Sequence, residues 1–139
     1  MILKTPSDAA VLKPESLPVH ERGGGARTTP LISPALGGRS FLTGYTAFDG
    51  GTEIPFHSHD CEESVVLMEG RAMLDIDDRS IELKAHDVTW IPPNVPHRFR
   101  NLSADQPMKI LWIYAHARAT RTLTASGETR PIAAEHGLR

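Results

Sequence analysis

From residue 40 onward the chain consists of short runs of strand-forming residues, in several of which hydrophobic and polar positions alternate. Phe99, for example, lies between Arg98 and Arg100. Glycine, proline, asparagine and aspartate separate the runs, as expected at turns. The predicted strands are residues 40–48, 63–67, 72–76, 80–83, 88–91, 97–101 and 109–115. Several short strands at regular spacing predict an all-β sandwich or barrel.

The two ends of the chain lack this pattern. Residues 1–26 are rich in proline, glycine and charge and have neither a helical nor a strand period, which predicts an extended arm. Residues 28–33 could form one short strand, which Pro30 confines to a sheet edge or a strand start. We expect the arm to cover an exposed edge by exchange within a homodimer. The predicted division is an arm over 1–38, a β-barrel over 39–116 and a polar tail over 117–139, with one helical turn near 133–136.

Length and charge narrow the class of protein. A chain of 139 residues and 15.2 kDa fits one compact domain. The net charge of -2 and the pI near 6.4 argue against nucleic acid as a partner. Cys61 stands alone, so no intrachain disulfide can form, and a reducing compartment is favoured. Because the first residues contain no apolar run long enough for a signal sequence or membrane span, we expect a cytoplasmic protein without a membrane partner.

The stretch from Gly51 to Gly70 contains the strongest chemical signal. His57 and His59 lie two residues apart, so in a strand both side chains project to one face. Glu63 keeps that parity if the chain stays extended, whereas Glu62 points to the other face. Two imidazoles and a carboxylate on one face indicate a metal site, with Glu63 preferred over Glu62 as ligand.

A fourth ligand is offered by His97, and here the sequence resembles the cupin superfamily. The first cupin motif, G-x5-H-x-H-x3-E-x6-G, is matched in full by Gly51, His57, His59, Glu63 and Gly70. The second motif, G-x5-P-x-G-x2-H-x3-N, is matched at Pro92, His97 and Asn101, but His86 and Asn94 replace its two glycines. Asparagine tolerates a left-handed backbone, and a histidine fits a turn of negative φ. The resemblance covers about residues 41–114 and implies a single-domain jelly-roll β-barrel whose interior holds three histidines and one glutamate.

This ligand set suits one divalent transition metal, which could be Fe, Mn, Ni, Co, Cu or Zn. Four protein ligands leave two positions of an octahedral ion open for water, substrate or dioxygen. We therefore expect a metal-dependent enzyme acting on a small organic molecule, with dioxygenase-type chemistry as the first hypothesis. The alternatives are a non-catalytic module that binds a small ligand, and a metal-dependent lyase or isomerase. The latter needs a general base, for which Tyr45, Tyr114 and His116 are candidates by residue type.

Three further side chains are predicted near the ion. Phe99 shares its parity with His97, and Cys61 shares its parity with His59, so both could line a substrate pocket. Tyr45 is the third pocket candidate. Core packing is the competing interpretation for Phe99 and Cys61. Catalysis by Cys61 is not expected, because the sequence fixes no base beside it.

Overall fold

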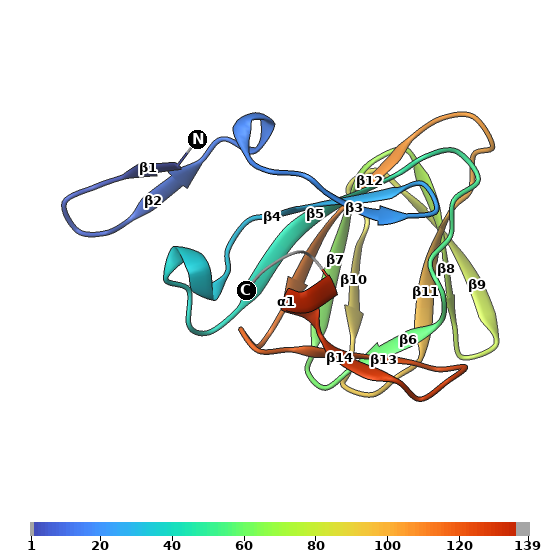
Figure 1. Cartoon of the computed structure of the whole chain (residues 1–139). Helices are drawn as coiled ribbons and strands as arrows, with labels where there is room; N and C mark the ends of the chain where they lie inside the picture. The colour runs from blue at the N-terminus through green and yellow to red at the C-terminus, as the bar shows by residue number, and fades with distance from the viewer. Residues whose placement is uncertain (1, 136–139) are drawn as a thin grey trace.

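The computed structural model describes residues 2–135, and its regular secondary structure is almost entirely β-strand, arranged in three sheets (Figure 1). The first six-stranded sheet has the order β10 (Val88–Ile91), β7 (Glu63–Glu69), β12 (Met108–Tyr114), β5 (Leu42–Phe48), β4 (Ala26–Pro30) and β3 (His20–Gly23). The second has the order β14 (Thr129–Pro131), β13 (Thr120–Leu123), β6 (His57–His59), β11 (His97–Asn101), β8 (Arg71–Ile76) and β9 (Arg79–Lys84). The predicted jelly-roll fold, all-β with almost no helix, is confirmed.

Both large sheets contribute to one hydrophobic core. Phe48 and Trp112 enter it from the first sheet, and Leu74 and Phe99 enter it from the second; all four side chains are buried. The alternation of buried and partly buried positions along β7, β11 and β12 places one face of each strand in this core. The strands predicted between residues 40 and 115 all form, each within two residues of its predicted ends.

Residues outside the predicted barrel range also join the sheets, so the boundaries at 38 and 116 do not mark the limits of the sheets. At the N-terminal side, β4 pairs with β5 on one side and β3 on the other, so the prediction of an edge strand was wrong. Pro30 is the last residue of β4. Proline has no backbone N–H to donate, and at the end of a strand this does not interrupt the hydrogen bonds between the strand's other residues and its neighbours. At the C-terminal side, β13 pairs with β6. The polar tail is thus partly built into the second sheet.

Residues 2–12, within the predicted arm, form a hairpin. Strands β1 (Ile2–Lys4) and β2 (Ala10–Leu12) pair only with each other and project away from the two large sheets (Figure 1). The remaining short elements are the 3-10 turns η1 (Pro14–Ser16) and η2 (Pro34–Leu36) and the helix α1 (Ile132–Glu135). The predicted helical turn begins one residue earlier than expected, and His136 lies outside the described residues. Over residues 2–135, no helix has the length and apolar character needed to cross a membrane.

Several motif positions have structural roles. Gly70 has a φ of +84°, and a Cβ there would lie 2.5 Å from the carbonyl oxygen of Pro107, so the tight turn requires glycine. Asn101 uses its side-chain amide to donate to the carbonyl oxygens of Asp49 and Gln106, which ties the loop after β5 to the loop between β11 and β12. Asn94 has the left-handed conformation that its side chain tolerates (φ +66°). His86 does too (φ +82°), so the expectation of a negative φ was wrong.

Candidate metal centre

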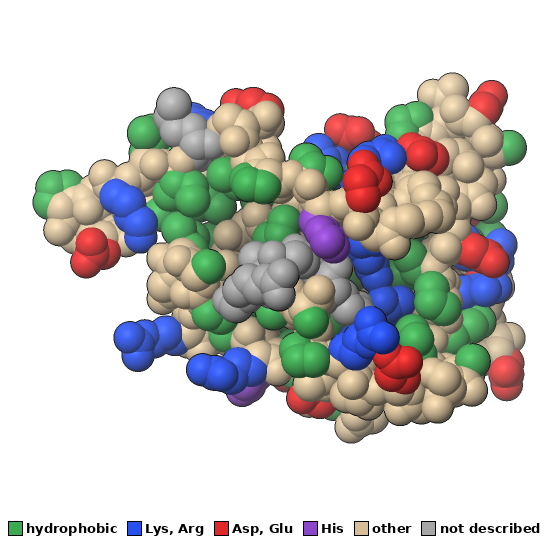
Figure 2. Space-filling model, in the orientation of Figure 1, with side chains coloured by type: hydrophobic (Ala, Val, Ile, Leu, Met, Phe, Trp, Pro, Cys, Tyr) green, Lys and Arg blue, Asp and Glu red, His purple; other side chains and the backbone are tan. Residues whose placement is uncertain are grey.

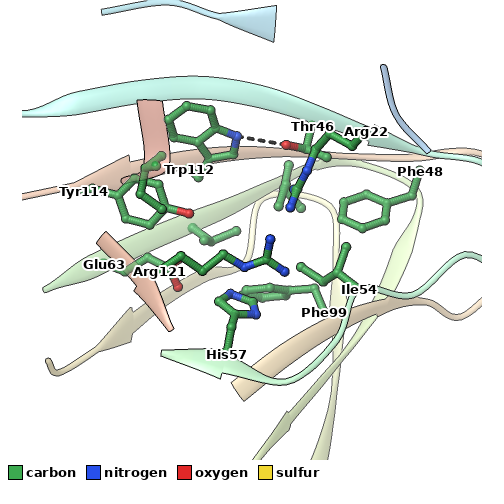
Figure 3. Close-up of a pocket in the computed structure, with 13 residues that line it drawn as sticks. Arg22, Thr46, Phe48, Ile54, His57, Glu63, Phe99, Trp112, Tyr114 and Arg121 are labelled. Atoms are coloured by element: carbon green, nitrogen blue, oxygen red, sulfur yellow. Dashed lines mark hydrogen bonds between the residues drawn. The ribbon is translucent and has the colours of Figure 1, made fainter. Parts of the chain in front are cut away.

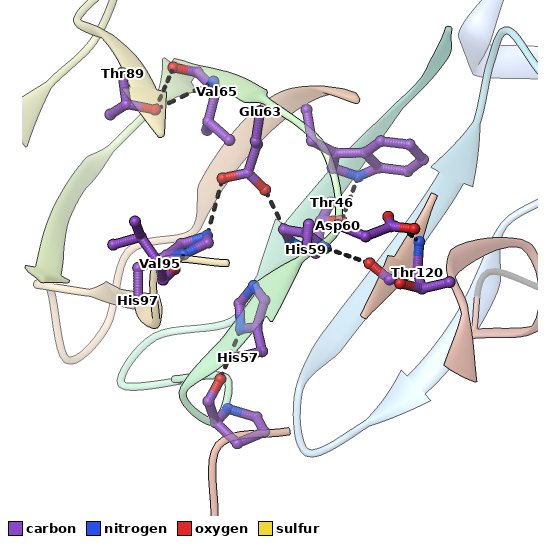
Figure 4. A network of polar contacts seen from close by, with 12 residues as sticks. Thr46, His57, His59, Asp60, Glu63, Val65, Thr89, Val95, His97 and Thr120 are labelled. Atoms are coloured by element: carbon purple, nitrogen blue, oxygen red, sulfur yellow. Dashed lines mark hydrogen bonds and ion pairs between the residues drawn. The ribbon is translucent and has the colours of Figure 1, made fainter. Parts of the chain in front are cut away.

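Three strands bring His57, His59, Glu63 and His97 together in the interior, as Figure 4 shows. β6 supplies the first two side chains, β7 supplies the carboxylate from its first residue, and β11 supplies His97 from its first residue. His97 lies directly opposite His57 in the pairing of β11 with β6, so both side chains project from the same face of the sheet. All four are almost fully buried, and their potential ligand atoms lie within 4.8 Å of one another.

Backbone carbonyl groups fix the orientation of all three imidazoles. The Nδ1 atoms of His57, His59 and His97 donate to the carbonyl oxygens of Pro55 (2.8 Å), Thr120 (3.0 Å) and Val95 (2.8 Å), respectively. A carbonyl oxygen only accepts, so each Nδ1 must carry the hydrogen in these contacts. When an imidazole is neutral, its Nε2 therefore faces the centre with a lone pair, which is the arrangement of metal-ligating histidines.

The carboxylate of Glu63 lies against the Nε2 atoms of two histidines, and a proton or a metal ion between these atoms would stabilise the contact. Its Oε1 lies 2.9 Å from Nε2 of His97, and its Oε2 lies 3.1 Å from Nε2 of His59. Burial raises the pKa of Glu63, but hydrogen bonds with His59 and His97 outweigh burial and hold that pKa well below its usual range. Burial lowers the pKa of His97, whereas the Glu63 carboxylate raises it, and the net shift is upward. Protons or a metal ion can occupy the space between these atoms.

The distances also fit a transition metal. Ligand atoms at ~2.1 Å from an ion lie roughly 3.0 Å apart when adjacent in an octahedron. The two contacts of Glu63 with His59 and His97 have this length. Burial, followed by the charges of neighbouring histidines and Arg121, keeps the pKa of His57 well below its ordinary value, so this imidazole is ready to act as a neutral ligand. The residues present therefore fit a divalent metal ion.

Glu62, the alternative carboxylate, points elsewhere. Its side chain is exposed, and its Oε1 accepts a hydrogen bond of 2.8 Å from Nε1 of Trp90 on the outer surface. Glu62 and Glu63 thus face opposite ways as predicted, although the chain bends at Asp60 and Cys61 and β6 and β7 lie in different sheets, so the extended path that the prediction assumed does not form.

The predicted pocket residues have different positions. Phe99 is buried, lines the cavity beside the four residues and lies 6.0 Å from His97 between ring centroids. Cys61 packs against the core without lining this cavity, and burial raises the pKa of its thiol. Tyr45 does not line the cavity, whereas Thr46 and Phe48 do. The ring of Tyr45 is half-buried instead, and the ammonium group of Lys109 lies 4.7 Å from its centroid. Of the candidate bases, Tyr114 lines the cavity and His116 is exposed.

Two arginines line the same cavity and were not predicted from the sequence. Arg121 comes from β13 and Arg22 from β3, and Figure 3 shows both side chains extending into the space next to His57. Arg121 is 7% exposed. Thr120 and Thr122 on either side of Arg121 favour a strand, and this was the only local sign of its position. Arginines in polar segments are mostly exposed, so no local pattern in the sequence placed this side chain inside. Trp112 and Tyr114 close the other side of the space, and Nε1 of Trp112 donates to Oγ1 of Thr46 (2.9 Å).

Comparison with known protein families gives one match over half the chain. The family described as Cupin domain matches residues 44–114, which include all four residues of the candidate metal centre. Among characterised sequences, polyketide synthase CurC from Streptomyces cyaneus is 35% identical over 91 residues, which are 64% of this chain and 58% of CurC. The chain therefore matches little more than half the length of that relative.

Solved structures with the same fold include two enzymes at 18% identity. A sugar phosphate isomerase of the cupin superfamily from Silicibacter pomeroyi superposes with a TM-score of 0.73 and covers 86% of this chain and 84% of its own. The polyketide cyclase RemF from Streptomyces resistomycificus superposes with a TM-score of 0.70 and covers 88% of this chain and 84% of its own. At this identity the likeness shows the fold alone.

Proposed function

Since this chain belongs to the cupin domain family, we propose that it is a metal-dependent enzyme acting on a small, oxygen-bearing organic molecule. The observation that carries the proposal is the convergence of three Nε2 atoms and one carboxylate in a buried cavity, with every Nδ1 held by a backbone carbonyl. A bound divalent ion would supply Lewis acidity toward substrate oxygen atoms at its open positions. His57, His59, Glu63 and His97 would hold it.

The other residues that line the cavity would exclude water, transfer a proton and stabilise negative charge on the substrate. Phe99, Trp112 and Tyr114 form apolar walls that limit access of water. The hydroxyl group of Tyr114 is the candidate for moving a proton, because this ring packs 4.5 Å from His59 between centroids. The guanidinium group of Arg121 would stabilise negative charge that develops on the substrate.

Two reaction types are proposed for this site. Dioxygenase-type chemistry, the first hypothesis from the sequence, uses the open metal positions for dioxygen. A non-oxidative reaction, such as the ring closure that the name of the polyketide cyclase RemF indicates for that protein, is the second proposal. A non-catalytic binding module remains the third class.

Metal analysis and turnover under two atmospheres test these proposals. Purified protein should contain about one transition metal per chain, and His59→Ala should lose most of it. Equal metal content in the variant would refute the ligand assignment. The metal-loaded protein is then incubated with diketones, phenols and keto acids under air and under nitrogen. Turnover that needs oxygen supports the dioxygenase, turnover unaffected by nitrogen supports the non-oxidative enzyme, and a thermal shift without turnover supports the binding module.

We also propose that the chain forms a homodimer through its N-terminal hairpin. Ile2, Leu3 and Val11 on this hairpin are between 43% and 49% exposed, and Figure 2 shows hydrophobic side chains gathered on the projecting segment. An isolated two-stranded hairpin is at best marginally stable in water, so a second copy is proposed to cover it. Sedimentation should give a dimer for the full chain and a monomer after deletion of residues 1–13. A monomeric full chain would refute the proposal.

A further inference from the structure

Arg121 shares a face of the second sheet with the candidate metal ligands. In the pairing of β13 with β6, Arg121 lies directly opposite His59, and Leu123 lies opposite His57. Residues opposite each other in antiparallel strands project to the same side of the sheet. The side chain of Arg121 is consequently directed into the interior, where it lines the cavity with His57 and Glu63.

Arg22 approaches the cavity from the first sheet. Along β3 its side chain and that of His20 are half-buried, whereas Glu21 and Gly23 between and after them are exposed. In Figure 3 the guanidinium groups of Arg22 and Arg121 both enter the space between Trp112 and His57. Two arginines from opposite sheets thus reach one small cavity.

The charge of this cavity is strongly positive once a divalent ion is present. Among the described residues that line it, Glu63 alone carries negative charge, against two guanidinium groups. Guanidinium groups in a partly water-excluded site bind carboxylate and other oxyanions by charge-assisted, often bidentate hydrogen bonds.

The shape of the site indicates how such an anion would enter. The inner cavity has a volume of about 20 Å³, which is room for little more than one water molecule. An outer depression of about 580 Å³ adjoins it, and Arg22, Ile54 and Arg121 line both spaces. The arginines therefore stand at the boundary between the metal-facing cavity and the depression open to solvent.

We propose that Arg22 and Arg121 select an organic oxyanion, a carboxylate or enolate, as the substrate. Its charged oxygen atoms lie between the guanidinium groups and the metal-facing cavity, and its body occupies the outer depression. The inference rests on the proposed function, because it assigns the substrate class of the same centre. It assigns to the two arginines a binding role, separate from holding the ion.

Calorimetric titration of the zinc-loaded protein with salicylate and with its neutral analogue salicylamide tests this. Salicylate should bind at least tenfold more tightly than salicylamide. Arg121→Gln and Arg22→Gln should each weaken salicylate binding by roughly 10- to 100-fold, as expected for loss of a charge-assisted hydrogen bond, and change salicylamide binding less than about twofold. Arg121→Lys should retain part of the affinity. Arg71→Gln is the matched control, since this exposed arginine pairs with Glu82 and lines neither the inner cavity nor the outer depression.

The proposal is overturned if wild-type protein does not bind salicylate, if it binds both probes equally, or if both glutamine variants bind salicylate like wild type. Zinc content is measured for every variant and should remain unchanged. Should Arg121→Gln fail to fold, Arg22→Gln and Arg121→Lys still decide the outcome. Arginine-dependent binding of salicylate in a protein that turns over no substrate upholds this inference and refutes the enzyme. Turnover with arginine-independent binding refutes this inference alone.

Discussion

Replacing Glu63 by glutamine tests the metal centre at its one charged ligand. The carboxylate contacts Nε2 of both His59 and His97 at 3.1 and 2.9 Å, and it is 3% exposed. Glutamine keeps the size and shape of the side chain but removes the charge that would offset a divalent ion. The variant should therefore fold, because its amide can still hydrogen-bond to these imidazoles, and yet bind metal weakly.

The size of the effect follows from ligand linkage. A metal present at 100 times its Kd stabilises the folded state by about 2.7 kcal/mol. For 139 residues the entropy of unfolding is roughly 0.3 kcal/mol/K, so this stabilisation raises Tm by about 9 °C. If the substitution weakens binding about 100-fold, the same metal concentration gives only about 0.4 kcal/mol, or about 1 °C. The metal-dependent shift in Tm should thus nearly disappear.

Differential scanning calorimetry of chelator-treated protein, with and without added zinc, measures this shift directly. Glu62→Gln is the matched control, because this neighbouring carboxylate lies on the outer surface beside Trp90. Glu62→Gln should retain the full metal-dependent shift. A full shift in Glu63→Gln, or its loss in Glu62→Gln, would refute both the ligand assignment and the parity argument behind it.

Two further predictions concern the scaffold. Asp75→Asn should destabilise the protein by about 1–3 kcal/mol at pH 7, measured by urea unfolding, because hydrogen bonds from Arg100, followed by Ser80 and Arg98, lower the pKa of Asp75. A lowered carboxyl pKa stabilises the protein above about pH 4, so the difference should shrink below that pH, while Asp77→Asn should have little effect at either pH. Gly44→Ala should cost about 1–3 kcal/mol, because the added Cβ would lie 2.2 Å from Cζ2 of buried Trp112; an unchanged urea midpoint would contradict this.

The sequence was sufficient for features that depend on local periodicity. Side chains alternate across a strand whatever the strand pairs with, which placed Phe99 on the face of His97. Parity also favoured Glu63 over Glu62, but it assumed an extended chain after His59, whereas the structure bends at Asp60 and Cys61 and begins a strand of the other sheet at Glu63. The strands between residues 40 and 115 were predictable for the same reason. The motif spacing added His97, 40 residues after His57, and implied the fold that brings the two together.

Tertiary structure alone decided which other side chains meet at the centre. The interior face of β13 is set by its pairing with β6, so Arg121 became a cavity residue through register rather than through any local pattern. The positions of Arg22 and Tyr45 were decided in the same way: β3 directs Arg22 to the cavity, and β5 directs the predicted pocket residue Tyr45 away from it. Pairing register depends on contacts between residues far apart in the chain. The polar composition of both ends therefore concealed the residues that give the site its positive charge.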